Sequence, residues 1–228
     1  MSRNDGVWVV IPVFNEAPVL EEVVTDVLAV FPNVVCVDDG SRDGSVEAVL
    51  RTGAHLVRHP VNLGQGAALQ TGLTYARSRP GAAYFVTFDA DGQHRLDDAV
   101  RMVELARSGA ADLVLGTRFA GDCADVPLRK RLVLRAAVLL SPAGRRLGLT
   151  DAHNGLRVLT RPVADDLDIT MNGMAHASEI VSYLARSRWR VREVPVSIRY
   201  TEYSRAKGQS LLNGVNILFD LSVRQRGS

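Results

Sequence analysis

Two carboxylates one residue apart, followed closely by an amide and an imidazole, are the side chains best suited to chemistry. Asp89 and Asp91 come directly after the apolar run 84–88, and Gln93 and His94 follow them. Carboxylate oxygens are preferred ligands of Mg²⁺ and Mn²⁺, and Gln93 or His94 can complete such a shell. A metal ion of this kind usually holds substrate phosphates. The alternative is a turn in which each aspartate hydrogen-bonds the local backbone.

The run 84–88 has the length and composition of a buried strand, and it is one of several such runs. Strand-like runs at 7–13, 34–37, 55–58, 84–88 and 112–117 alternate with helical patterns at 18–30, 45–51, 64–77 and 96–107. This alternation predicts an α/β fold with a parallel sheet and helices on both faces. In such a sheet, ligands bind outside the carboxyl ends of the strands.

Polar clusters follow the first, second and fourth of these strands. They are Asn15 with Glu16, Asp38 and Asp39 with Ser41, and Asp89 with Asp91. Because parallel strands bring their carboxyl ends to one edge of the sheet, we expect the three clusters to meet. Asp38 or Asp39 would bond a ribose hydroxyl or a base amide or imide. The pattern therefore predicts a site for a nucleoside diphosphate group with a metal ion.

Other phosphate-binding and catalytic patterns are absent from the sequence. A dinucleotide fingerprint needs three glycines after the first strand, but that turn, 14–17, contains none. A nucleotidyltransferase, which would share the core and the metal carboxylates, should show a glycine-rich first turn with a basic residue. No P-loop, serine nucleophile elbow or zinc spacing occurs either.

Composition and charge limit the class of protein. The chain has 228 residues and a net charge of +2, which argues against a dedicated nucleic-acid binder. Cys36 and Cys123 do not form a disulfide framework, so we expect a reducing compartment, with Cys36 as a small buried hydrophobe. No signal peptide or membrane-spanning run is apparent.

The second half is less regular and locally basic. Segment 126–149 holds six Arg or Lys and no acid. It predicts either a buried helix with a solvated basic end or a helix at a membrane interface, with basic residues on lipid phosphates. The remaining expectations are a loop at 118–126, a helix at 127–147 broken near 141–142, a strand at 155–160, a helix at 174–186, an edge strand at 191–198, a mobile loop at 200–210 and helical spacing at 211–223.

Four ordered segments carry a family resemblance. They are Ile11-Pro12-Val13-Phe14-Asn15-Glu16, Val37-Asp38-Asp39-Gly40-Ser41-Arg42-Asp43-Gly44-Ser45, Asn62-Leu63-Gly64-Gln65-Gly66-Ala67-Ala68 and Asp89-Ala90-Asp91-Gly92-Gln93-His94. On these segments the chain resembles the family-two inverting glycosyltransferases, and most of all the dolichyl- or polyprenyl-phosphate sugar synthases. The resemblance implies a GT-A fold with a mostly parallel sheet. It also implies one domain, 1–228, with nucleotide-sugar binding in 1–118 and the acceptor side in 119–228.

The resemblance further implies roles for individual residues. Pro12, Asn15, Glu16, Ser41, Gly64 and Ala90 would line the nucleotide, and Asp39 would hold its base or ribose. Asp89 and Asp91 would contact the ribose and a Mg²⁺ or Mn²⁺ ion, with Gln93 completing the metal shell. Arg118 would face the acceptor or the phosphates, Asp151 falls where many relatives carry a catalytic base, and Arg205 and Lys207 lie in a loop that closes over the diphosphate in relatives.

The implied reaction is metal-dependent, inverting sugar transfer from a GDP- or UDP-linked donor, and two acceptor classes stay open. A polyprenyl phosphate is already anionic and needs no base, and Arg118, Arg129, Arg131 and Arg157 are then candidate partners for it. A sugar hydroxyl, in cell-envelope polysaccharide or glycolipid synthesis, needs a base such as Asp151, which could instead only cap a turn. A non-catalytic sugar-nucleotide-binding relative is a further alternative.

The lipid phosphate is favoured, because the basic segment 126–149 suits a cytoplasmic protein peripheral to a membrane. Three positions depart from the synthases that the chain resembles. Asn154-Gly155-Leu156-Arg157 replaces their usual Ser-Gly-Phe-Arg, and Arg135 stands where a serine is expected near the acceptor phosphate. These departures concern the acceptor rather than the donor chemistry.

Overall fold

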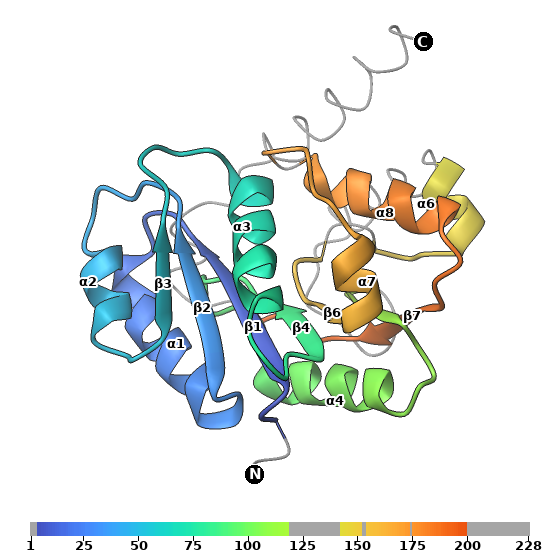
Figure 1. Ribbon diagram of the computed structural model, residues 1–228, viewed down its shortest axis with the longest axis horizontal. Helices are drawn as coiled ribbons and strands as arrows, with labels where there is room; N and C mark the ends of the chain where they lie inside the picture. The colour runs from blue at the N-terminus through green and yellow to red at the C-terminus, as the bar shows by residue number, and fades with distance from the viewer. Residues whose placement is uncertain (1–3, 119–141, 152–153, 174, 200–228) are drawn as a thin grey trace, which may run out of the picture.

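The computed structural model describes residues 4–118, 142–151, 154–173 and 175–199 (Figure 1). Seven strands form one sheet: β1 (Val7–Val13), β2 (Asn33–Asp38), β3 (His55–Arg58), β4 (Tyr84–Thr87), β5 (Leu113–Thr117), β6 (Arg157–Thr160) and β7 (Val191–Pro195). The helices are α1 (Ala17–Val30), α2 (Ser45–Leu50), α3 (Gln65–Arg77), α4 (Leu96–Arg107), α6 (Pro142–Leu147), α7 (Arg161–Asp166) and α8 (His176–Arg186).

The sheet is mostly parallel, as expected, and has the strand order β3-β2-β1-β4-β6-β5-β7. β6 runs antiparallel to both of its neighbours, β4 and β5, whereas every other neighbouring pair is parallel. The sequence did not reveal that β6 separates β4 from β5. β4, which leads to Asp89, therefore lies in the middle of the sheet, and β7 is an edge strand as expected.

Helices cover both faces because the strands are apolar on both faces. In β1, Val9 and Ile11 pack into a core shared with α1, α2 and α4. Trp8 and Val10 point the other way, into a core shared with α3, α7 and α8. Successive side chains of a strand point to opposite faces, so the position of a residue along its strand decides which layer of helices it packs against.

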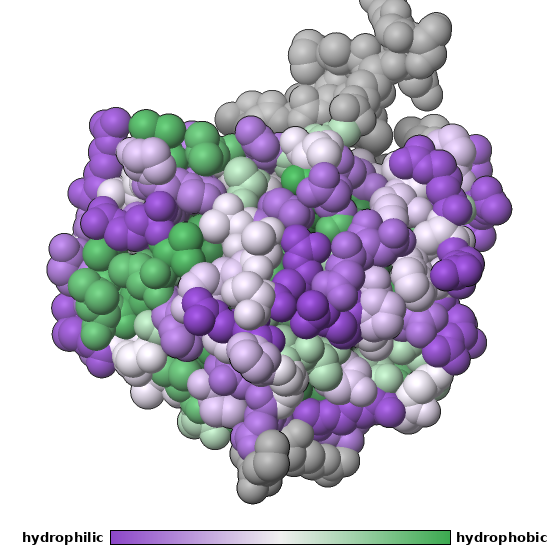
Figure 2. All heavy atoms as spheres, viewed as in Figure 1, coloured by the Kyte–Doolittle hydropathy of each residue, from purple (hydrophilic) through white to green (hydrophobic). Residues whose placement is uncertain are grey.

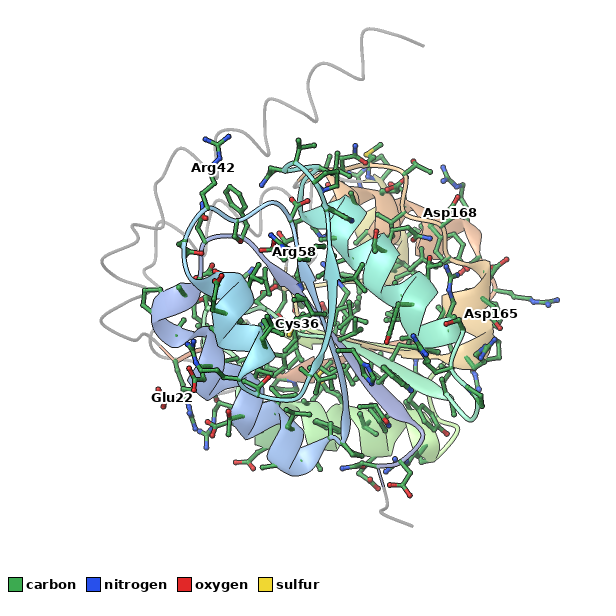
Figure 3. All side chains as sticks on the ribbon, turned by 60° about the vertical axis from the view of Figure 1, so that its left-hand side comes forward. Glu22, Cys36, Arg42, Arg58, Asp165 and Asp168 are labelled. Carbon is green, nitrogen blue, oxygen red and sulfur yellow. The ribbon has the colours of Figure 1, made fainter. Side chains whose placement is uncertain are left out.

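Cys36 lies in the interior on β2 and is fully buried (Figure 3). Burial raises the pKa of its thiol to about 12, so Cys36 behaves as the small apolar residue that the sequence predicted.

The expected elements up to residue 117 are confirmed within one or two residues. Later differences are larger: the strand expected at 155–160 begins only at Arg157, and α7 (Arg161–Asp166) was not expected. The strand expected at 191–198 ends at Pro195, although Ile198 forms an isolated bridge with His94. The expectations for 119–141 and 200–228, among them the mobile loop 200–210, lie outside the described residues. Within the described ranges, no helix is long and apolar enough to cross a membrane.

Large apolar side chains are exposed mainly near one end of the sheet. Figure 2 shows apolar surface over the α1, α2 and β3 side of the visible face, whereas the opposite side is mostly hydrophilic. In the part of the chain that the structure describes, the exposed large hydrophobic residues are Phe14, Leu50, Val61 and Leu63. Phe14 directly follows β1 and is 44% exposed. It therefore places an aromatic ring at the carboxyl edge of the sheet, beside the polar clusters.

Candidate active site

The loops after β1 and β2 are joined by hydrogen bonds, which brings the first two polar clusters together. The Asn15 amide donates to Ser41 Oγ (3.0 Å) and the Arg42 amide donates to Asn15 Oδ1 (2.9 Å). Asn15 adopts a positive φ of 54°, a conformation in which asparagine is enriched. Asn15 and Ser41 therefore shape the same edge, where Pro12 and Glu16 are partly exposed.

The start of α1 is held by the same loop. The Glu16 amide donates to Ser45 Oγ (2.9 Å), and the Ala17 amide donates to Asp43 Oδ2 (3.1 Å). Burial favours a higher pKa for Asp43, but its hydrogen bonds with Ser45 and Ala17 outweigh this and lower its pKa. These bonds satisfy amides at a helix start that has no side-chain cap of its own.

Asp39 organises the loop that leads into α3. Its carboxylate accepts from His59 Nδ1 (2.7 Å), the Leu63 amide (2.9 Å) and the Gly64 amide (2.7 Å). The other ring nitrogen of His59 bonds Thr71 Oγ1 at 3.0 Å. Asp39 is 3% exposed. The contacts observed for Asp39 are thus structural, and its contact with a base or ribose stays a prediction.

The glycines of the third motif allow α3 to approach the segment before α8. A Cβ on Gly64, whose φ is +98°, would lie 2.3 Å from the Asn172 carbonyl oxygen. A Cβ on Gly66 would lie 1.9 Å from the Met171 carbonyl oxygen. The Gly66 amide donates to the Asn172 carbonyl at 2.7 Å. Only glycine fits these positions, which place the second half of the chain beside the first.

Asp89 is held from several sides at the end of β4. Gln65 Nε2 donates to its Oδ1 (3.2 Å), and His94 Nε2 bonds its Oδ2 (2.9 Å). Burial favours a higher pKa for Asp89, but the bond and charge of His94, together with the charge of Arg157, lower its pKa. Because His94 is only 7% exposed, it bonds Asp89 from the protein interior and orients the carboxylate. This geometry favours His94 as a partner of Asp89 rather than as a metal ligand.

Of the two carboxylates, Asp91 is the one whose ionised form is disfavoured by its surroundings. Burial, reinforced by the negative charge of Asp89, raises the pKa of Asp91 to about 6. Its Oδ1 accepts the Gln93 amide at 3.0 Å, so the turn that the sequence suggested is formed. A turn and a metal site are compatible here, because a divalent cation would offset the repulsion between the two carboxylates.

The residues fit a divalent cation that is only partly held by protein. Among the described residues, no group of three or more His, Cys, Asp or Glu side chains is placed to bind a metal ion. Asp89 and Asp91 would supply part of the shell, and a diphosphate would supply the rest. Gln93, which is 9% exposed, stays a predicted third ligand. The Ala90 side chain packs in the α1 and α4 core, so a nucleotide contact there could come only from its backbone.

Arg118 and Asp151, which the sequence assigned to separate roles, form an ion pair. Arg118 Nε donates to Asp151 Oδ2 (2.6 Å) and Nη2 donates to Oδ1 (2.8 Å). The Asp151 amide in turn donates to Glu193 Oε1 at 3.0 Å. Arg129, Arg131, Arg205 and Lys207 lie outside the described residues.

Gly155 is a residue of this site whose function the sequence did not reveal. A Cβ on Gly155 would lie 2.1 Å from Asp89 Oδ2, so the Asp89 carboxylate rests directly on the Gly155 backbone. Thr87 Oγ1 donates to the Gly155 carbonyl at 2.6 Å and fixes this approach. The only sequence signal was a glycine between polar Asn154 and an apolar strand, which is too common to identify a contact with Asp89.

Comparison with known proteins agrees with this architecture. Residues 8–167 match the model of the family described as glycosyl transferase family 2, so the chain belongs to this family and is a glycosyltransferase. The UDP-N-acetylglucosamine–dolichyl-phosphate N-acetylglucosaminyltransferase of Methanococcus voltae is 26% identical over 97% of this chain and 96% of that protein. The polyprenol monophosphomannose synthase of Mycolicibacterium smegmatis is 29% identical over 92% of this chain and 82% of that protein.

A solved structure shares the fold. Glucosyl-3-phosphoglycerate synthase from Mycobacterium tuberculosis, crystallised with Mn²⁺ and UDP-glucose, has a TM-score of 0.65 and 20% identity and covers 91% of this chain and 78% of that chain. Together with the sheet order, this likeness confirms the expected GT-A fold.

Proposed function

We propose that this glycosyltransferase moves a sugar from a nucleoside diphosphate sugar to a polyprenyl phosphate, with inversion at the anomeric carbon and with a divalent metal ion. The observation that carries the proposal is the convergence of Asp89 and Asp91 with the loops after β1 and β2 at one sheet edge. In the donor site, Pro12, Asn15, Glu16, Asp39, Ser41 and Gly64 surround the nucleotide.

Asp89 and Asp91, with Gln93, would hold the metal ion. Such an ion supplies Lewis-acid stabilisation of the diphosphate leaving group. The residues of the chain do the positioning: His94 and Gln65 keep the Asp89 carboxylate oriented, and the Gly155 backbone supports it. An acceptor oxygen forms the new bond to the anomeric carbon as the bond to the diphosphate oxygen breaks, and the diphosphate leaves with that electron pair.

The lipid phosphate is the acceptor that the site favours. A phosphate oxygen is already anionic, so no base has to remove a proton from it. The side chain of Asp151, the candidate base, has 0% exposure and already pairs with Arg118 through both carboxylate oxygens. The names of the Methanococcus and Mycolicibacterium relatives refer to a dolichyl phosphate and to a polyprenol monophosphomannose, which supports the same class of acceptor.

We assign Arg118, together with Arg129 and Arg131 of the acceptor-side part 119–228, to the lipid phosphate. Arg205 and Lys207 are assigned to the donor diphosphate. Guanidinium groups suit a phosphate because they can donate two parallel hydrogen bonds. The basic segment 126–149 is assigned to a peripheral contact with the cytoplasmic face of a membrane, where anionic lipids attract Lys and Arg.

Transfer to a sugar hydroxyl is the second candidate. It is favoured by the charge interaction between Asp151 and Arg157, because Arg157 also interacts with Asp89. Asp151 therefore lies within electrostatic reach of the donor site, where a base would be needed. The pairing of Asp151 with Arg118 argues against this candidate.

The test is an assay of the full chain with radiolabelled GDP- and UDP-linked sugars, with Mn²⁺ or Mg²⁺, and with polyprenyl phosphate in detergent. The expected product is a lipid-phosphate sugar, formed only with metal and with one nucleotide family. NMR of the product should show the anomeric configuration opposite to that of the donor. Retention of configuration, or transfer only to oligosaccharide acceptors, would contradict the proposal. Binding without turnover of any donor would indicate the non-catalytic relative.

A further inference from the structure

Three buried polar side chains belong to the segments that surround Asp89: two of them interact with its charge, and the third precedes Gly155, whose backbone contacts its carboxylate. They are Asn154, Arg157 and His176, which are 5%, 3% and 3% exposed. Arg157 stands two residues before Leu159 on β6, and Leu159 packs in the core shared with α3 and α8. Because side chains alternate along a strand, Arg157 projects from that same face. His176 is the first residue of α8, the helix that packs against this same face of the sheet.

Two hydrogen-bond donors in this cluster are unsatisfied. Neither Asn154 Nδ2 nor Arg157 Nη1 has a partner among the described residues, although both atoms are buried. The other end of the Asn154 amide is used, since its Oδ1 accepts the Leu156 amide at 2.9 Å. A buried donor without an acceptor costs free energy, so unsatisfied groups of this kind point to a missing ligand.

His176 adds a hydrogen-bond acceptor. Its Nδ1 donates to the Gly173 carbonyl oxygen at 2.8 Å, which leaves Nε2 as the unprotonated nitrogen of a neutral ring. Burial and the positive charge of Arg157 lower the pKa of His176 to about 4, so the ring is neutral at pH 7. The cluster thus offers two donors and one acceptor.

The charges around the cluster favour an uncharged ligand. The Arg157 guanidinium already interacts with the carboxylates of Asp89 and Asp151, so a further anion is not needed to balance it. A hydroxyl group can both accept from an N–H group and donate to a ring nitrogen. Neighbouring hydroxyls on a sugar ring match this mixture better than a phosphate does.

The cluster directly adjoins the donor site. Gly155, which lies between Asn154 and Arg157 in sequence, contacts Asp89 Oδ2 through its backbone. On the other side, a Cβ on Gly66 would lie 2.9 Å from His176 Cβ, and the preceding residue, Gln65, hydrogen-bonds Asp89. In the proposed reaction, the group next to the diphosphate at Asp89 and Asp91 is the sugar to be transferred.

We propose that Asn154 Nδ2 and Arg157 Nη1 donate hydrogen bonds to hydroxyl groups of the transferred sugar, that His176 accepts a hydrogen bond from one of them, and that this cluster selects the donor sugar. This inference rests on the proposed function and deepens it. Asn154 is the most informative residue to change, because serine can still accept the Leu156 amide bond but lacks the Nδ2 donor.

The test is calorimetric binding to the full chain with Mn²⁺. Dissociation constants are measured for UDP, GDP and their common sugar conjugates with the wild type, Asn154→Ser and His176→Phe. The expected result is an unchanged affinity for the nucleoside diphosphate and a roughly tenfold weaker affinity for the nucleotide sugar, which is about the loss of one hydrogen bond. Asn33→Ser is the matched control, since Asn33 begins β2 at the opposite end of the sheet. A donor that lacks the bound hydroxyl should lose affinity in the wild type but not further in the variant.

The outcomes separate the two proposals. If the wild type binds a nucleotide sugar and neither variant changes the ratio between the two dissociation constants, this inference fails and the proposed function stands. Equal weakening of nucleotide and nucleotide sugar would also overturn it, because that result indicates a general structural effect. If the wild type binds no nucleoside diphosphate at all, both proposals fail.

Discussion

Arg118 and Asp151 bind each other through two parallel hydrogen bonds of 2.6 and 2.8 Å, and the Arg118 amide adds a third at 3.2 Å. The Asp151 side chain is fully buried in this pair, whereas Arg118 keeps 16% exposure. A bidentate pair of this kind fixes both groups in orientation. The arginine is therefore the member of the pair that stays partly accessible, and Asp151 holds it in place.

Asp151→Asn tests this arrangement. With a polyprenyl phosphate acceptor we expect kcat to fall by less than about tenfold, because no base is required, whereas loss of a general base usually costs about 10² to 10⁴-fold. The KM for the lipid should rise, because Arg118 loses its partner. Asp112→Asn is the matched control, since Asp112 forms a similar bidentate pair with Arg190 at the other end of β5. A thousandfold loss of kcat in the Asp151 variant alone would favour the hydroxyl acceptor.

Asp91→Asn is expected to separate metal binding from folding. Asparagine keeps an oxygen for the Gln93 amide but removes the charge that Asp89 repels. Without metal, the variant should melt at a higher temperature than the wild type at pH 7. With Mn²⁺ and nucleotide, the wild type should gain stability and the variant should gain little, with turnover reduced at least about a hundredfold. Asp97→Asn, at a position 83% exposed in its side chain, should change neither quantity. An Asp91 variant with normal turnover would refute the metal assignment.

Gly155→Ala should displace Asp89. The added Cβ would lie 2.1 Å from Asp89 Oδ2, so the carboxylate or the 154–157 backbone has to move. We expect turnover to fall at least about tenfold, since small displacements of positioned groups are costly for catalysis. Gly173→Ala is the control, because a Cβ there meets nothing within 4 Å and Gly173 has no positive φ. Kinetic assays of both variants decide the matter, and equal activity in the two would contradict the close contact.

His59→Leu should weaken nucleotide binding through the loop that Asp39 organises. The substitution removes bonds to Asp39 and Thr71 and leaves a buried carboxylate less satisfied, which we expect to lower the free energy of unfolding by about 2 kcal/mol. His59→Gln, which retains a donor, should recover part of this loss. His55→Leu is the control, because exposed His55 stacks on Trp8 away from the loop. Urea unfolding and nucleotide affinity are the measurements, and unchanged values for His59→Leu would mean that the backbone alone holds the loop.

The sequence alone predicted the first half of the fold well because its signals there are local. Apolar runs ended by polar clusters located β1, β2 and β4, and the helical patterns between them located α1, α3 and α4. The same clusters led to Asp89 and Asp91 and to the proposal of a donor site at the carboxyl edge. The turn and the metal site, which looked like alternatives in sequence, are compatible in the structure because the Gln93 amide uses one oxygen of Asp91.

Contacts between distant residues could be decided only by the tertiary structure. Asp151 is 33 positions from Arg118, and His59 is 20 positions from Asp39, so no local pattern marks either pair. The antiparallel insertion of β6 between β4 and β5 brings Gly155 against Asp89 and places Arg157 beneath it. Sequence patterns report which side chains are buried and which carry chemistry. Which of these groups satisfy one another depends on the packing of strands and helices, because burial leaves a polar atom to bond only the partner that the fold places beside it.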